Sequence, residues 1–267
     1  MKQISILGCG WLGLPLAKSL IGKGFSVKGS TTSADKIAVL KDVGIEAFQI
    51  EVSESRITGG MDSFLKNSEI LIIDIPPKLK NVSSENFVKK IQNLIPFIEK
   101  STIRKVVFIS STSVYGDDNS DITEATKPQP DTESGKQLLE AERLLQSNSD
   151  FKTMVIRFGG LIGENRHPIH FLAGKQNIEN PKAPVNLIHQ ADCIGIIEKI
   201  IELDCRSETF NAVAPFHPTR KEYYIQKAIE LGLPLPGFAE ETTSFGKIID
   251  CSLLEKTLNY KFQYPNL

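Results

Sequence analysis

The feature that most constrains the fold lies at the start of the chain, where three glycines follow a short apolar run. Residues 4–7 are predicted to form a strand, and Gly8, Gly10 and Gly13 follow it in the order G-x-G-x-x-G. In this pattern the first glycine permits a tight turn, the second lets the backbone approach a pyrophosphate, and the third allows close helix–strand packing. The free N–H groups of the helix's first turn then face the anion. Because the pattern follows a strand and opens a helix, it predicts a dinucleotide-binding turn rather than a glycine turn without a ligand.

Alternating strands and helices continue this pattern through the first 160 residues. Short runs rich in Ile and Val predict further strands at 25–30, 47–52, 70–75, 106–110 and 154–158. Amphipathic stretches predict helices at 14–21, 84–99 and 133–146. Ser84 is expected to cap the second of these helices, and Pro96 to kink or end it. Apolar strands separated by helices indicate a parallel sheet covered on both faces, so the predicted fold is α/β, a Rossmann-type doubly wound parallel sheet.

The pattern changes after Gly163, where prolines become frequent and regular periods become short. Two more helices are predicted there, at 192–203 and 220–231. These features indicate a small C-terminal substrate lobe laid against the sheet. The predicted division is a dinucleotide-binding core at 1–160, a segment at 186–204 that packs back on it, and a smaller lobe within 161–267.

Composition restricts the kinds of partner. The formal net charge is -1, so the chain lacks the basic balance that nucleic-acid binding requires. No apolar run reaches the roughly 18 residues of a membrane span. The four cysteines, Cys9, Cys193, Cys205 and Cys251, form no CxxC pair and have no His at ligand spacing, so neither a disulfide framework nor a metal site is expected. A cytoplasmic protein with a small-molecule substrate is the expectation.

The end of the second predicted strand indicates which dinucleotide is bound. A site that prefers NAD places Asp or Glu there to accept a hydrogen bond from the ribose 2′-hydroxyl. Thr31 occupies this point and is followed by Thr32 and Lys36, and hydroxyls beside a lysine suit a 2′-phosphate. Asp35 lies at about the expected distance of 20 residues, but it falls beyond the strand and is also explained as a helix cap. NADP is therefore preferred, with NAD as the alternative.

Further cofactor contacts are expected from Trp11 and Leu12 in the glycine loop. Ile75 and Pro76 follow the fourth strand, where the chain would pass the adenosine portion of the cofactor and where prolines would make the backbone rigid. Trp11 either covers the cofactor or packs on the sheet, and the sequence leaves both interpretations open.

Four motifs occur in a recognisable order along the rest of the chain. Residues 106–116 read Val-Val-Phe-Ile-Ser-Ser-Thr-Ser-Val-Tyr-Gly, 134–136 read Ser-Gly-Lys, 155–163 read Val-Ile-Arg-Phe-Gly-Gly-Leu-Ile-Gly, and 186–192 read Asn-Leu-Ile-His-Gln-Ala-Asp. Together they resemble the extended short-chain dehydrogenases/reductases, the family of sugar-nucleotide epimerases and dehydratases. The Gly-Cys-Gly-Trp-Leu-Gly loop is similar to that of an atypical YeeZ-like branch. The resemblance covers most of the chain and implies a Rossmann core with a substrate lobe.

The resemblance also implies a catalytic tyrosine four residues before a lysine, on one face of a helix. The lysine lowers the tyrosine pKa, so the phenolate can act as a base. Lys136 matches the lysine, with an ordinary surface lysine as the alternative, and Ser111 matches the hydroxyl that holds the substrate oxygen. The tyrosine position is Thr132, whose hydroxyl cannot be a general base near neutral pH. Tyr115 and Glu133 are candidate substitutes, although such a tyrosine usually packs and such a glutamate usually lies in solvent at a helix start.

Substrate contacts are expected from Ser111 and Thr112, and from two residues of the second lobe. Arg166 could bind a phosphate or carboxylate bidentately, with an ordinary loop arginine as the alternative. His189 lies in a segment that lines the cleft in the family, although a structural histidine beside a capping Asp192 is equally consistent with the sequence.

Two functions therefore remain open. The first is an NAD(P)-binding oxidoreductase or epimerase acting on a polar, possibly sugar-nucleotide, substrate. The second is a catalytically impaired NADP(H)-binding sensor or partner-binding protein that lacks the family tyrosine. By family analogy the helices at 84–99 and 133–146 would form a homodimer.

Overall fold

Seven parallel strands form the central sheet. The computed structural model describes residues 2–77, 85–118, 121–203, 205, 208–240 and 245–266. The strands of the sheet are β1 (Gln3–Leu7), β2 (Ser26–Thr31), β3 (Glu46–Gln49), β6 (Ile70–Ile73), β7 (Lys105–Ser111), β9 (Lys152–Phe158) and β12 (Thr209–Ala212). Their order is β12-β9-β7-β6-β1-β2-β3, and every pairing in it is parallel. The strand order reverses between β1 and β6, so the predicted doubly wound sheet is confirmed, and its switch point lies at the end of β1.

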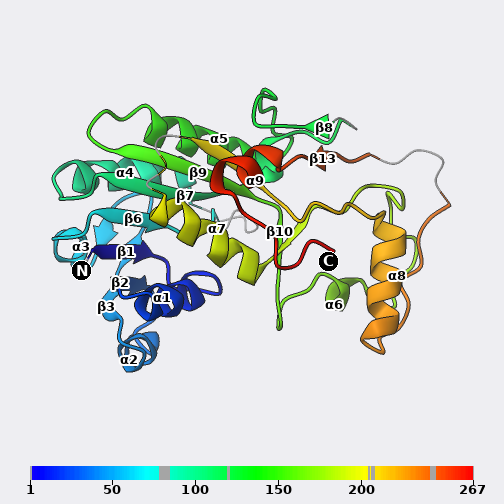
Figure 1. Cartoon of the computed structure of the whole chain (residues 1–267), viewed down its shortest axis with the longest axis horizontal. Coiled ribbons are helices and arrows are strands. Elements are labelled where there is room, and N and C mark those ends of the chain that lie inside the picture. Colours follow the sequence, from blue (N-terminus) through cyan, green and yellow to red (C-terminus); the bar gives the residue numbers. More distant parts are fainter. Residues whose placement is uncertain are drawn as a thin grey trace.

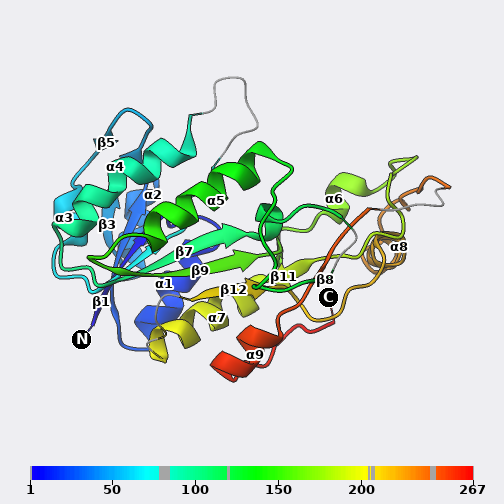
Figure 2. The same cartoon turned by 90° about the horizontal axis from the view of Figure 1, so that it is seen from above.

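Helices cover both faces of the sheet (Figures 1 and 2). On one face lie α3 (Met61–Leu65), α4 (Phe87–Glu99) and α5 (Glu133–Gln146); on the other lie α1 (Gly13–Gly22), α7 (Gln190–Glu202) and α9 (Ser252–Leu258), while α2 (Lys36–Asp42) lies beside β3. The helices bury apolar side chains against strands that are themselves buried on both faces. This two-sided burial explains why the strands read as continuous apolar runs.

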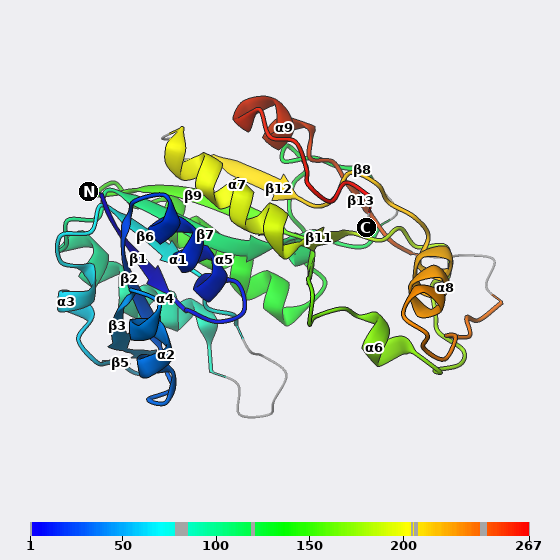
Figure 3. The same ribbon diagram turned by 60° about the horizontal axis from the view of Figure 1, so that its bottom comes forward.

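The second lobe contains only part of the chain that follows residue 160. It contains the paired strands β10 (Gly160–Ile162) and β11 (Leu187–His189), with α6 (Ile169–Leu172) and α8 (Arg220–Glu230), which lie at the far end from the N-terminus (Figure 3). Its separate core includes Ile169, Val185 and Tyr223. In contrast, β12 belongs to the main sheet, and α9 packs its apolar side chains into the main core.

The remaining elements are short. They are β4 (Glu51–Val52) paired with β5 (Ile57–Thr58), β8 (Asp121–Ile122) paired with β13 (Ile248–Ile249), and the 3-10 turn η1 (Thr112–Val114). Within the described ranges no helix is long and apolar enough to cross a bilayer.

The structure corrects several local expectations. Pro96 was expected to kink or end its helix; it does not end it but lies inside α4, because one lost backbone hydrogen bond is outweighed by a buried face that includes Ile91 and Leu94. The expected cap Ser84 lies outside the described residues, and Asn86 caps α4 by accepting a hydrogen bond from the Lys89 N–H at 3.0 Å. In α7 the cap is His189, and Asp192 lies within the first turn.

A buried ion pair joins α5 to β9 beneath the carboxyl ends of the strands. Arg157 donates from Nη2 to Glu142 Oε2 at 2.6 Å and from Nε to Oε1 at 3.1 Å, and the two side chains are 7% and 1% exposed. Ser110 of β7 donates to the same carboxylate at 2.6 Å. A bidentate pair with a further donor satisfies the charges that burial would otherwise leave unpaired.

Replacing Arg157 with Ala is expected to lower the free energy of unfolding by about 3–5 kcal/mol, because the Glu142 charge is left buried without a partner. Urea denaturation measures the loss. The matched control is Arg143→Ala on α5, the helix that carries Glu142; its ion pair with Glu140 is exposed and should contribute under about 1 kcal/mol. Equal losses in the two variants would contradict the argument.

Candidate functional site

The glycine loop runs from β1 into α1 at the switch point of the sheet. Gly8 has a φ of +109°, and a Cβ there would lie 2.4 Å from the Asp74 carbonyl oxygen. A Cβ on Gly13 would lie 2.2 Å from the Gly8 carbonyl oxygen, whereas one on Gly10 meets no atom within 4 Å. Gly8 and Gly13 are therefore required for packing, and Gly10 leaves the loop open on the side from which a ligand would approach.

Unused backbone donors mark the anion position. Among the described residues, the N–H groups of Trp11 and Leu12 have no hydrogen-bond acceptor, while those of Gly8, Cys9 and Gly10 bond within the protein. The free groups lie at the N-terminus of α1, where the helix dipole favours negative charge. Together with the two tight glycines, they form a cradle that fits the pyrophosphate of a dinucleotide.

Asp74 is the residue that the sequence interpretation missed. It follows β6 directly across the switch point, and its Oδ2 lies 3.2 Å from the position of a Cβ on Gly13. Burial raises the pKa of its carboxyl to about 7, while the Gly13 N–H and the charge of Arg166 oppose that rise. A lone carboxylate after an apolar strand that ends at the switch point was the signal that could have found it.

Trp11 packs against the main core and also contacts residues at the entry to the second lobe. Its carbonyl oxygen accepts a hydrogen bond from Gln190 Nε2 at 2.7 Å, and the Arg166 guanidinium lies 4.8 Å from its ring centre. A Cβ on Gly163 would lie 2.9 Å from Trp11 Cζ2, so only glycine accepts the ring there. Residues distant in sequence therefore hold the side chain that projects from the glycine loop.

The end of β2 presents hydroxyls, as the sequence indicates. Thr31 is the last residue of β2 and accepts a hydrogen bond from the Ser33 N–H at 3.2 Å, which leaves its own proton free to donate. Thr32 and Lys36 are exposed. Asp35 occupies the N-cap position of α2, but its side chain makes no capping hydrogen bond, so the capping interpretation is wrong.

Ile75 and Pro76 leave β6 beside the glycine loop. Ile75 is half-buried with Cγ2 3.2 Å from a Cβ built on Gly8, and Pro76 is exposed. Ile75 therefore packs against the first turn of the glycine loop.

The residues expected to act on a substrate lie at the end of β7 and the start of α5. Ser111 is half-buried and accepts a hydrogen bond from the Ser113 N–H at 3.1 Å, so its own proton remains available to another acceptor. Thr112 is buried. A Cβ on Gly135 would lie 2.1 Å from the Ser113 carbonyl oxygen, so the first turn of α5 packs directly on the turn that follows β7.

Thr132 has a structural role at the start of α5. Its Oγ1 caps the helix by accepting a hydrogen bond from the Gly135 N–H at 3.1 Å. Lys136, one turn later, is exposed. Glu133 accepts a hydrogen bond from Gln137 at 2.7 Å and is exposed, which agrees with a solvated carboxylate at a helix start.

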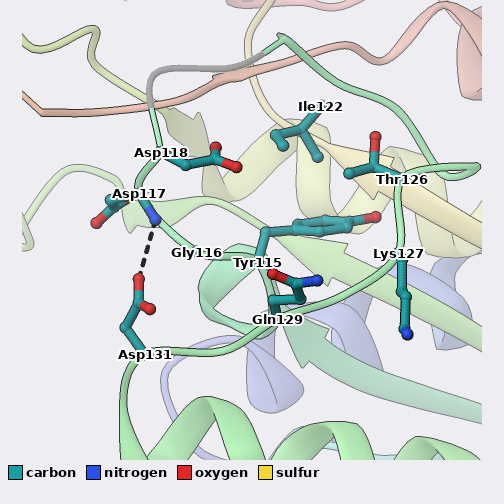
Figure 4. Close-up of a pocket in the computed structure, with 9 residues that line it drawn as sticks. All are labelled: Tyr115, Gly116, Asp117, Asp118, Ile122, Thr126, Lys127, Gln129 and Asp131. Atoms are coloured by element: carbon teal, nitrogen blue, oxygen red, sulfur yellow. Dashed lines mark hydrogen bonds between the residues drawn. The ribbon is translucent and has the colours of Figure 1, made fainter.

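The structure contradicts Tyr115 as a substitute base. Its hydroxyl accepts a hydrogen bond from Arg157 at 2.6 Å and donates to Asn211 Oδ1 at 2.9 Å, and the residue is 2% exposed. Burial raises its pKa further above its ordinary value of 10.0, so a phenolate is not available near neutral pH. The ring instead borders a cavity of about 370 Å³, lined by the loop between β7 and α5 and by none of the glycine-loop residues (Figure 4).

His189 is held at the junction between β11 and α7. Its Nδ1 accepts a hydrogen bond from the Ala191 N–H at 3.2 Å, its ring stacks on Tyr264 at 3.8 Å, and burial lowers its pKa. Tyr264 is in turn fixed because its N–H donates to the buried Asp192 carboxylate at 3.0 Å. With Nδ1 accepting and the ring neutral, the remaining proton of His189 is on Nε2.

Three comparisons with known proteins bear on this arrangement. The model of the NAD dependent epimerase/dehydratase family matches residues 80–188. The chain is 35% identical to Protein YeeZ of Escherichia coli (strain K12) over 268 residues, which covers 100% of this chain and 97% of that protein. The chain belongs to the NAD-dependent epimerase/dehydratase family, in its YeeZ-like branch.

Solved structures agree with this assignment at the level of the fold. A putative NAD-dependent epimerase/dehydratase from Methylobacillus flagellatus superposes with a TM-score of 0.80 at 24% identity, covering 99% of this chain and 94% of that one. MoeE5 in complex with UDP-glucuronic acid and NAD also has a TM-score of 0.80, at 19% identity, covering 98% and 94%. The family is NAD-dependent, and in this member the tyrosine position is a helix cap.

Replacing Asp74 with Asn is expected to flatten the pH dependence of stability. The folded-state pKa rises from 3.8 to about 7, so between these pH values the folded chain keeps a proton that the unfolded chain has lost. The free energy of unfolding therefore falls as the pH rises through this window. At about pH 8 the variant should be more stable by on the order of 2 kcal/mol, roughly half of the full shift, because the half-buried carboxyl is partly screened by solvent.

Urea denaturation at about pH 5 and pH 8 tests this prediction. Asp42→Asn, at an exposed position at the end of α2, is the control and should leave the pH dependence unchanged. Identical pH profiles for wild type and Asp74→Asn would show that Asp74 ionises normally.

Proposed function

We propose that this protein binds NADP(H) at the switch point of its sheet and acts as an oxidoreductase or epimerase on a polar substrate. The observation that carries the proposal is the cradle at the start of α1. Gly8 and Gly13 allow the loop to approach β6, and the Trp11 and Leu12 N–H groups have no acceptor among the described residues. These are the donors that a pyrophosphate requires at a helix N-terminus.

The preference for NADP over NAD rests on the end of β2. Thr31 occupies the position where an NAD site places a carboxylate, and exposed Thr32 and Lys36 lie just beyond it. A lysine and hydroxyls would bind a 2′-phosphate, which a carboxylate would repel. Asp35 is exposed on the same turn and supports the alternative, NAD.

The chemistry falls to side chains beside the crevice. A bound nicotinamide cofactor supplies hydride transfer. Ser111 would donate its free proton in a hydrogen bond to a substrate oxygen, and Lys136 would bind the cofactor ribose from α5. A nucleotide-linked sugar is the substrate class we favour, because MoeE5, with the same fold, is described in complex with UDP-glucuronic acid and NAD.

A second function is favoured by one specific observation. Thr132 uses its hydroxyl to cap α5, and Tyr115 is held by Arg157 and Asn211, so neither supplies a base. A protein that keeps the cofactor cradle but has no general base could act as a sensor of the NADP(H) redox state or as a partner-binding protein.

We place the protein in the cytoplasm, where its four cysteines would stay reduced. The homodimer through α4 and α5 stays a prediction.

Titration with NADPH and NADH, followed by the fluorescence of the single tryptophan, tests cofactor binding and preference. We expect Lys36→Ala to weaken NADPH binding about fivefold and leave NADH binding unchanged, because only NADPH carries the 2′-phosphate. Lys41→Ala, at another exposed position on α2, is the matched control. Tighter binding of NADH than of NADPH to wild type would overturn the preference.

Product analysis separates the enzyme from the sensor. Wild type and Lys136→Ala are incubated with cofactor and a panel of UDP-sugars, and the sugars are identified afterwards, since an epimerase returns its hydride and leaves no net change in the cofactor. Conversion by wild type that Lys136→Ala lowers by about tenfold or more supports the enzyme. Cofactor binding with no conversion of any sugar favours the sensor.

A further inference from the structure

We infer that Arg166 is a ligand of the cofactor diphosphate, supplied by the C-terminal lobe and held in place by Trp11. The inference rests on the proposed binding of NADP(H). The sequence predicted that Arg166 would contact the substrate, whereas here it contacts the cofactor. It also gives Trp11 a function, because the tryptophan becomes the support on which that arginine lies.

The backbone at Arg166 is fixed by a narrow turn. The Gly163 N–H donates to the Arg166 carbonyl oxygen at 2.9 Å, and the Arg166 N–H donates to the Gly163 carbonyl oxygen at 3.0 Å. The same Gly163 packs against the Trp11 ring, where a Cβ would be only 2.9 Å from Cζ2. The turn that carries Arg166 is therefore docked directly on the glycine loop.

The side chain is positioned, but its N–H donors have no acceptor among the described residues. The guanidinium lies 4.8 Å from the centre of the Trp11 ring, a cation–π contact that favours one orientation without occupying the N–H donors. Arg166 is exposed, and among the described residues it has neither an ion-pair partner within 4.0 Å nor a side-chain hydrogen bond. A planar group with five free donors is suited to bind a phosphate bidentately.

The Trp11 contact brings this cation beside the glycine loop. The charge of Arg166 lowers the pKa of Asp74, which lies beside Gly13, and also acts on Cys193 at the start of α7. By geometry, the Arg166 guanidinium lies against the ring of Trp11, whose own N–H is one of the two free groups just before α1. A diphosphate held between these N–H groups and the guanidinium would be bound from two sides.

Such a cation is needed there for an electrostatic reason. The Asp74 carboxyl lies beside Gly13, where the two phosphates of the cofactor would bind. When this carboxyl is ionised, its negative charge repels the phosphates. The positive charge of Arg166, which already lowers the pKa of Asp74, would offset this repulsion. The lobe would therefore take part in cofactor binding and not only in substrate binding.

The experiment compares two diphosphate probes, because a sugar nucleotide also carries a diphosphate. ADP-ribose represents the cofactor and UDP represents the substrate, and both are titrated against wild type, Arg166→Ala, Arg166→Lys and Lys221→Ala. Lys221 is an exposed cation on the same lobe and serves as the charge-matched control. Thermal unfolding of each variant confirms that it is folded.

We expect Arg166→Ala to weaken ADP-ribose and NADPH binding by about tenfold or more, Arg166→Lys to give an intermediate loss, and Lys221→Ala to bind as wild type. UDP binding should change little. Binding of ADP-ribose by Arg166→Ala within about twofold of wild type would overturn the inference, as would a selective loss of UDP binding, which would make Arg166 a substrate ligand. If wild type bound neither NADPH nor ADP-ribose, the proposed function itself would fail.

Discussion

The close approach of the glycine loop to strand β6 is the constraint on which the site depends. Gly8, with its positive φ, lies so near the Asp74 carbonyl that no larger residue fits, and Gly13 lies equally near Gly8. This contact joins the ends of β1 and β6, the two strands at which the sheet reverses its order. It brings the N-terminus of α1 to the carboxyl end of β6 and places the Asp74 carboxyl group beside it.

Below the crevice, a buried polar network decides which side chains are available for chemistry. Glu142 and Arg157 neutralise each other, and Arg157 and Asn211 together satisfy the Tyr115 hydroxyl. The tyrosine therefore has a structural role, and burial raises its pKa. Ser111 is not part of this network. Its hydroxyl oxygen accepts a hydrogen bond from the Ser113 N–H, and its proton is available to a further acceptor.

Trp11 connects the two parts of the molecule. It belongs to the glycine loop by sequence, yet its partners Gly163, Arg166 and Gln190 all come from the segment that leads into or returns from the second lobe. A change in the loop is thus transmitted to the lobe through packing, a cation–π contact and one hydrogen bond. In this family member, the glycine loop and the second lobe are physically linked through Trp11.

The sequence by itself determined the α/β fold, the glycine loop and the family. These can be recognised from local patterns, namely the periods of strands and helices, the glycine spacing and short motifs, which do not depend on contacts between distant residues. It also predicted site roles for Ser111 and Lys136, and it placed Thr132 at the position of the family tyrosine. Only the tertiary structure decided the partner of Trp11, the role of Tyr115 and the surroundings of Asp74. Each depends on a contact between residues far apart in the chain, and burial and charge at such contacts are set by packing that no local pattern encodes.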